Sequence, residues 1–234
     1  MEELREISRW FVPGLGVKRW FLFLFAGITL LGFGLRLYTL NALPLIIDEI
    51  GFAAHASDIL HGQQVPIFAP YRGDSAAVYS WLLAGFMALF GQNPFAIRLL
   101  SLILGTLSIP ALYVLGREWW SGRVGLLVAA FLATYPAHIF FSRLSLFNIA
   151  DPLFAMLTLA LLARAIRRPS FQRYWILAGL MAGISQYFYQ SSRLLLVLMA
   201  VYVVLSAVRD QLSGEKKWEL RTGNWKLLAN LASW

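Results

Sequence analysis

Cysteine is absent from this sequence, so disulfide bonds, thiolate catalysis and cysteine-ligated metal sites are excluded. Charge is scarce as well, because only 14% of the residues are charged and only 12 are acidic. What the chain has instead is apolar surface: 59% of its residues are hydrophobic and its mean hydropathy is +0.65. To cover that surface, a water-soluble fold of this length would need more polar residues than this chain has. The sequence therefore predicts a membrane protein.

The apolar residues occur in continuous runs long enough to cross a bilayer as helices, which favours an all-α polytopic membrane protein. Seven such segments lie at about 20–40, 76–90, 95–116, 124–142, 149–166, 174–191 and 194–208. We expect Pro110 and Pro136 to kink the helices that contain them.

The basic residues predict which segments cross. If 76–90 stays at the outer face, most of the 20 basic residues lie in inner loops, as the positive-inside rule favours. This segment is also short for a span. We therefore expect about six transmembrane helices, with 76–90 at or dipping into the outer surface. The alternative is a short tilted span that inverts every later loop.

This topology divides the chain into four parts. Residues 1–19 form a cytoplasmic N-terminus, 20–208 a transmembrane module with a long outer loop at 41–94, and 209–226 a basic cytoplasmic loop. Residues 227–234 resemble the start of a further span, so we expect the chain to be a fragment. We expect a multi-pass plasma-membrane protein. Since its basic residues serve orientation, we expect no nucleic-acid partner.

The outer loop contains a second helical pattern. From Glu49 to His61, Phe52 and Ala56 fall on one helical face with Ile59 and Leu60, whereas Glu49, His55 and Asp58 fall elsewhere. This pattern predicts a helix lying in the interface plane, with its charged side away from the packed face.

Topology places several ionisable residues and one asparagine at the outer rim of the membrane. They are Asp48, Glu49, Arg143, Asn148 and Asp151, with Arg36, Arg98 and Arg193 at outer helix ends. Carboxylates are suited to proton removal or cation binding, and guanidinium groups to a phosphate at headgroup level. The arginines have a plainer alternative, which is to snorkel to the headgroups. Tyr189 lies in an aromatic outer turn, which suits either a sugar site or an interfacial belt.

The order of these features resembles a known family. Asp48-Glu49 opens the first outer loop, a short hydrophobic helix follows, and then come PFAIRL, REWWSGRVGLL and FSR. This series resembles the N-terminal half of the integral-membrane GT-C glycosyltransferases, of the protein mannosyltransferase and aminoarabinose transferase types. The resemblance covers most of residues 20–208 and implies a GT-C type module.

The resemblance also implies an activity and roles for residues. It implies transfer of a sugar from a polyprenyl-phosphate donor to an acceptor protein, lipid or glycan on the non-cytoplasmic side. Asp48 matches the residue taken as catalytic base, and Glu49 the one that supports it. The reaction would be a single inverting displacement. Arg143, Arg98 and Arg193 are candidates to bind the donor phosphate, Tyr189 to bind sugar, and a divalent cation stays open as a cofactor.

The second outer loop departs from the family pattern. Many relatives carry an acidic residue five positions after the arginine that corresponds to Arg143, and here that position is Asn148. Asp151, followed by Pro152, matches the Asp-Pro form of other relatives. We favour Asp151 because it supplies a carboxylate, but both positions stay candidates.

Two other functions use the same residues. A transporter or flippase of lipid-linked sugars needs the arginines but no base, although we find no internal repeat of the kind common in transporters. A non-catalytic membrane subunit is the third hypothesis.

Overall fold

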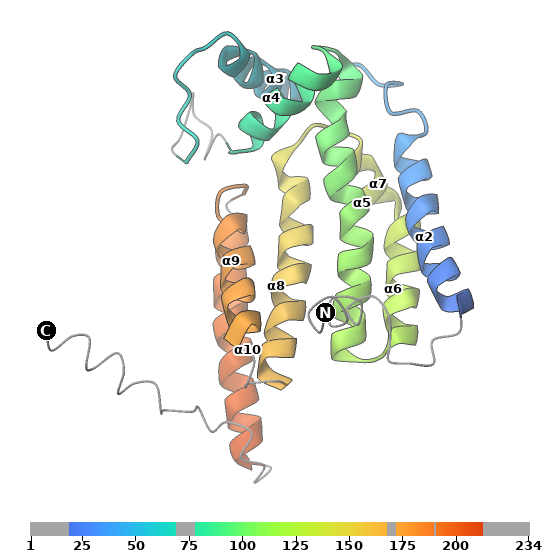
Figure 1. The fold of residues 1–234 in the computed structure, drawn as a ribbon, viewed down its shortest axis with the longest axis vertical. Helices are drawn as coiled ribbons and strands as arrows, with labels where there is room; N and C mark the ends of the chain where they lie inside the picture. The colour runs from blue at the N-terminus through green and yellow to red at the C-terminus, as the bar shows by residue number, and fades with distance from the viewer. Residues whose placement is uncertain (1–18, 69–77, 168–171, 190, 213–234) are drawn as a thin grey trace, which may run out of the picture.

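The computed structural model describes residues 19–68, 78–167, 172–189 and 191–212 (Figure 1). These residues form helices, and no strand occurs among them. The helices are α2 (Arg19–Leu37), α3 (Ile47–Leu60), α4 (Val78–Phe90), α5 (Pro94–Trp119), α6 (Gly122–Thr134), α7 (Pro136–Ser142), the 3₁₀ turn η1 (Phe147–Ile149), α8 (Ala150–Arg167), α9 (Gln172–Ser185) and α10 (Ser192–Leu212). The predictions for residues 1–18, 213–226 and 227–234 lie outside the described residues.

The all-α membrane class is confirmed. By length and composition, α5, residues 147–167 and residues 192–209 are each able to cross a membrane. The bent pair α6–α7 passes the same test when its two helices are taken together, and it counts as a fourth if they form one broken span. Residues 21–37 and α4 are shorter apolar helices. The expected segment 174–191 is represented by α9, which stops at Ser185. It stops there because residues 186–189 form a turn toward α10.

α5 is the central helix of the bundle and contacts α2, α4, α6, α7 and α8. Asn93 caps its first turn by accepting a hydrogen bond from the backbone amide of Ala96 at 3.0 Å. The 26-residue helix continues through Pro110. A buried ion pair lies near each end, at Arg98 and at Glu118. These two positions are twenty residues apart, which is about 30 Å at the rise of an α-helix and equals a bilayer core.

The predicted kink at Pro136 is confirmed, because α6 and α7 meet there at 62°. Proline has no N–H to donate to the carbonyl of Leu132, so the break leaves backbone acceptors short of partners. Arg36 of α2 supplies donors: its guanidinium reaches the carbonyls of Leu132 and Ala133, each at 3.2 Å. The Arg36 side chain is fully buried. The snorkelling alternative for Arg36 is therefore wrong.

α3 and α4 lie together across one end of the bundle (Figure 1). The connections from α2 to α3, from α7 to α8 and from α9 to α10 reach the same end (Figure 1). An apolar cluster joins them, in which Phe52 of α3 and Leu83 of α4 pack with Leu100 of α5 and with Phe188. Segments distant in sequence thus meet at this end, where the candidate site lies.

Candidate functional site

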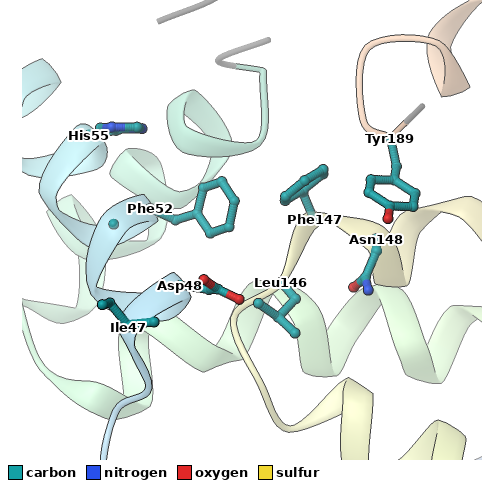
Figure 2. A pocket seen from close by; sticks show the side chains of 9 residues that line it. Ile47, Asp48, Phe52, His55, Leu146, Phe147, Asn148 and Tyr189 are labelled. Atoms are coloured by element: carbon teal, nitrogen blue, oxygen red, sulfur yellow. The ribbon is translucent and has the colours of Figure 1, made fainter. Parts of the chain in front are cut away.

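A pocket of about 430 Å³ opens where α3, the α7–α8 connection and the α9–α10 turn meet. Figure 2 shows Asp48 on one side of it and Asn148 and Tyr189 on the other. Its lining residues are Ile47, Asp48, Gly51, Phe52, His55, Leu146, Phe147, Asn148 and Tyr189. The structure thus brings three of the predicted site residues into one pocket.

Asp48 is exposed and lies on the pocket-facing side of α3. With Gly51, Phe52 and His55 it forms an i, i+3, i+4, i+7 series, which is one face of a helix. Within the described part of the chain, its carboxylate has no hydrogen-bond or ion-pair partner. Both of its oxygens are therefore open to a molecule in the pocket.

Glu49, the next residue, is fully buried. Its carboxylate accepts two hydrogen bonds from Arg98 of α5, both at 2.8 Å. It also accepts the backbone amides of Ser145 at 2.9 Å and Ile46 at 3.1 Å. Burial acts to raise the pKa of Glu49, but these hydrogen bonds outweigh it and hold the pKa below its ordinary value.

This burial corrects two expectations for α3. Glu49 and His55 were predicted to lie away from the packed face, but both are buried together with Phe52 and Ala56. The prediction was wrong because it assumed, from the helical pattern alone, that a charged side chain faces solvent. Arg98 neutralises the charge of Glu49 and donates a hydrogen bond to each of its carboxylate oxygens. Glu49 is therefore able to lie in the packed face of α3. The bond to Ile46 also caps α3, as the third residue of a helix commonly does.

Arg98 uses all five of its N–H donors inside the protein. Besides the two bonds to Glu49, its terminal nitrogens donate to the carbonyls of Leu40 at 2.8 Å, Leu43 at 3.0 Å and Pro44 at 3.0 Å. Arg98 therefore does not snorkel to the headgroups, and it has no donor left to bind a phosphate. Arg98 instead fixes the segment that leads into α3, and with it the position of Asp48.

Ser145 joins the α7–α8 connection to the helices above it. Its backbone amide holds Glu49, while its hydroxyl pairs with the Tyr79 phenol of α4 at 2.9 Å. The same phenol pairs with Ser101 of α5 at 2.8 Å. Burial raises the pKa of Tyr79 to about 12, so the phenol remains neutral. Ser145 thus fixes the loop that carries Asn148.

The two candidates of the second loop occupy different places. Asn148 lines the pocket opposite Asp48 (Figure 2), and its Oδ1 atom is buried without a hydrogen-bond partner. Asp151 is absent from the pocket lining. Its carboxylate accepts the hydroxyls of Ser191 and Ser192, the latter at 2.8 Å. The carboxylate of the Asp-Pro sequence, Asp151, therefore links α8 to the start of α10.

The remaining candidate arginines, Arg143 and Arg193, are not in the pocket lining. Arg143 donates to the carbonyl of Leu35 at 2.5 Å, and its Nε atom is buried without a partner. Arg193 is exposed at the start of α10. Among the residues that the structure describes, no lysine or arginine lines the pocket. The pocket itself therefore offers one carboxylate, one amide, the imidazole of His55 and aromatic rings.

Sequence reasoning missed the aromatic wall. Phe147 packs edge-on against Phe52, with ring centroids 4.9 Å apart, and against Tyr189 at 5.2 Å. A signal was available for Phe52, which lies four residues after Asp48 and so on the same helix face. The sequence contains no such signal for Phe147, because a phenylalanine in an apolar loop has no distinctive pattern.

A divalent cation would need several oxygen or imidazole ligands. Over the described residues, no group of three or more histidine, aspartate or glutamate side chains comes together. Among the described residues that line the pocket, Asp48 is the only carboxylate, Asn148 the only amide and His55 the only imidazole. These residues by themselves do not fit a metal site.

Comparison with known proteins gives one result. The family model for dolichyl-phosphate-mannose-protein mannosyltransferases matches residues 74–228, which is more than half of the chain. The matched range includes Arg98, Arg143, Asn148 and Tyr189, whereas Asp48 and Glu49 precede it. No curated protein and no solved structure matches. The chain belongs to the dolichyl-phosphate-mannose-protein mannosyltransferase family and is a membrane glycosyltransferase of the GT-C type.

Proposed function

We propose that this protein transfers a sugar from a polyprenyl-phosphate donor to an acceptor hydroxyl or amine on the non-cytoplasmic face, with inversion and with Asp48 as the base. The family supports a lipid-linked donor in general terms. The pocket supports the position of the chemistry, since it lies at the end of the bundle where α3 and α4 cross the helices.

The contrast between Asp48 and Glu49 carries the proposal. Two adjacent carboxylates have opposite environments: Glu49 is buried and bound by Arg98, whereas Asp48 is exposed and open toward the pocket. Such a division is a common way to give neighbouring acids separate roles. Glu49 holds the helix, and Asp48 stays available to accept a proton.

The chemistry is one displacement at the anomeric carbon. Asp48 takes the proton of the acceptor while the acceptor oxygen or nitrogen forms the new bond to that carbon. The bond from the carbon to the phosphate oxygen breaks, and its electron pair leaves with the polyprenyl phosphate. The proton therefore ends on Asp48 and the negative charge on the departing lipid.

The lining suggests which part of the reactants the pocket holds. A pocket that is lined by an open carboxylate and by no lysine or arginine repels phosphate, whereas aromatic rings suit the apolar faces of a sugar. We therefore assign the glycosyl group and the acceptor to this pocket. The phosphate lies outside it, near Arg143 or Arg193, because Arg98 has no free donor. Asn148, not Asp151, is the second-loop residue that contacts the reactants.

The expected topology fits this arrangement. The end opposite the pocket holds Arg164 and Arg167 around the Glu118 carboxylate, together with Arg173. Basic residues favour the cytoplasmic side. We infer that 41–94 is an outer loop of a plasma-membrane protein whose N-terminus is cytoplasmic.

The test is transfer by the full chain in proteoliposomes. Radiolabelled polyprenyl-phosphate mannose is supplied with a membrane-protein and glycan extract as acceptor, followed by donors that carry other sugars. Asp48→Asn should lower transfer about 10²- to 10⁴-fold, because the proton acceptor is lost. Asp58→Asn, on the same helix, is the matched control and should retain activity.

Two results would count against the proposal. Unchanged transfer by Asp48→Asn would remove Asp48 as the base. Movement of intact labelled lipid between leaflets, without release of free polyprenyl phosphate, would favour the transporter hypothesis.

A further inference from the structure

Asp151 connects α8 to the start of α10, on the side of the pocket that holds Asn148 and Tyr189. It lies in the first turn of α8, and its carboxylate accepts the hydroxyls of Ser191 and Ser192 where α10 begins. The side chain of Ser192 is buried. Each carboxylate oxygen of Asp151 therefore has a separate hydroxyl partner, and the pair of bonds ties the α9–α10 turn to α8.

The same turn carries Tyr189. The backbone amide of Ser192 donates to the carbonyl of Tyr189 at 3.1 Å, and Gln186 donates to the carbonyl of Ser192 at 2.9 Å. The Tyr189 ring packs edge-on against Phe147 with centroids 5.2 Å apart, and both line the pocket (Figure 2). A continuous set of contacts thus runs from Asp151 through Ser192 to the aromatic wall.

We propose that Asp151 is a positioning residue that holds Tyr189 against Phe147, and that these two rings form the surface on which the glycosyl group stacks. This inference rests on the proposed function for its sugar, but not for its geometry. It gives the Asp-Pro sequence of the second loop a role different from metal binding or proton transfer, since Asp151 does not line the pocket.

The serines explain why a carboxylate is needed at this position. Two hydroxyl donors arrive from consecutive residues, and a carboxylate offers an acceptor oxygen to each. An asparagine at position 151 would still accept one hydroxyl and could donate to the other. Asp151→Asn therefore preserves the connection in large part, whereas Asp151→Ala removes it.

The experiment is a double-mutant cycle on the full chain in proteoliposomes, with polyprenyl-phosphate mannose as the donor. Tyr189→Ala should raise the donor KM about tenfold and change kcat little, as expected for loss of one stacked ring. Asp151→Ala should raise KM to a similar extent, and the double variant should add little to either. Asp151→Asn should restore a KM within about threefold of the wild type.

A second measurement does not depend on activity. The natural chain has no cysteine, so a Phe147→Cys and Tyr189→Cys pair can be cross-linked with a short bifunctional maleimide without background. Adding Asp151→Ala should slow cross-linking several-fold, and adding Asp151→Asn should not. Thermal unfolding of each variant checks that it is folded.

Failure of this inference is distinguishable from failure of the proposed function. Additive effects of Asp151→Ala and Tyr189→Ala, or equal cross-linking with and without Asp151→Ala, would overturn the positioning role. Loss of kcat in Asp151→Asn equal to that in Asp151→Ala would instead assign Asp151 to catalysis or metal binding. Neither result changes the test of Asp48.

Discussion

At the scale of single residues, the Glu49–Arg98 pair determines where Asp48 lies. Arg98 reaches Glu49 on α3 and three carbonyls of the preceding segment, while Ser145 reaches the same glutamate from the α7–α8 connection. Burying two charges costs free energy that their mutual attraction offsets only while both are present. The pair therefore holds α3, the segment that precedes it and the α7–α8 connection in place against α5.

Removing one partner of this pair should destabilise the protein. Arg98→Met or Glu49→Leu leaves a buried charge unpaired, which costs about 3–5 kcal/mol. The double variant Arg98→Met and Glu49→Leu should recover part of the loss, because no buried charge remains. Thermal unfolding in detergent measures all three. A double variant that is less stable than either single variant would contradict this account.

The pair also predicts a dependence of stability on pH. Because the folded pKa of Glu49 lies below the ordinary value of 4.5, its stabilisation is fully present above that value. It is lost as the pH falls through the folded pKa, where the carboxylate takes up a proton. Glu49→Gln should therefore show a smaller acid loss of melting temperature than the wild type. An identical acid profile for the two would contradict the prediction.

At the scale of elements, α5 and α6 approach each other through glycines. A Cβ atom on Gly125 would lie 2.6 Å from the carbonyl oxygen of Tyr113, and one on Gly116 would lie 2.9 Å from the Cα of Gly125. Backbone meets backbone here, so no side chain can rotate away. Small residues at such crossings allow close helix packing in membranes.

Gly125→Ala should lower stability by about 1–3 kcal/mol, because the added methyl group forces the helices apart. Gly27→Ala is the matched control, since nothing lies within 4 Å of a Cβ at that position of α2. It should be neutral or slightly stabilising through helix propensity. Equal melting temperatures for the two variants would mean that α5 and α6 are not in close contact.

At the scale of the whole molecule, the pocket and the Glu118 cluster lie at opposite ends of α5. Arg164 pairs with Glu118 at 2.5 Å and Arg167 approaches it at 4.0 Å. The proposed function requires that the pocket end faces outward and this basic end faces the cytoplasm. Orientation is therefore part of the proposal and is open to direct measurement.

Single cysteines test the orientation in a chain that has none of its own. Gln64→Cys, exposed after α3, should react with a membrane-impermeant maleimide on intact cells. Trp120→Cys, 65% exposed at the other end of α5, should react only after permeabilisation. The reverse pattern would place the pocket in the cytoplasm and would contradict transfer on the outer face.

The sequence by itself determined the membrane class, most of the helices and the bend at Pro136. Continuous apolar runs and the missing N–H of proline affect only the local backbone, so their consequences can be predicted from the sequence alone. It also singled out Asp48, Asn148 and Tyr189, although it favoured Asp151 over Asn148 as the site residue of the second loop.

Tertiary structure alone decided which charges are buried and which are open. Arg98 lies 49 positions from Glu49, and Asp151 lies 41 from Ser192. Adjacent carboxylates look alike in sequence, and only the helix packed against each one distinguishes them. The hydrogen bonds that separate the buried, paired carboxylate of Glu49 from the open one of Asp48 form between distant segments, so packing decides them and local pattern does not.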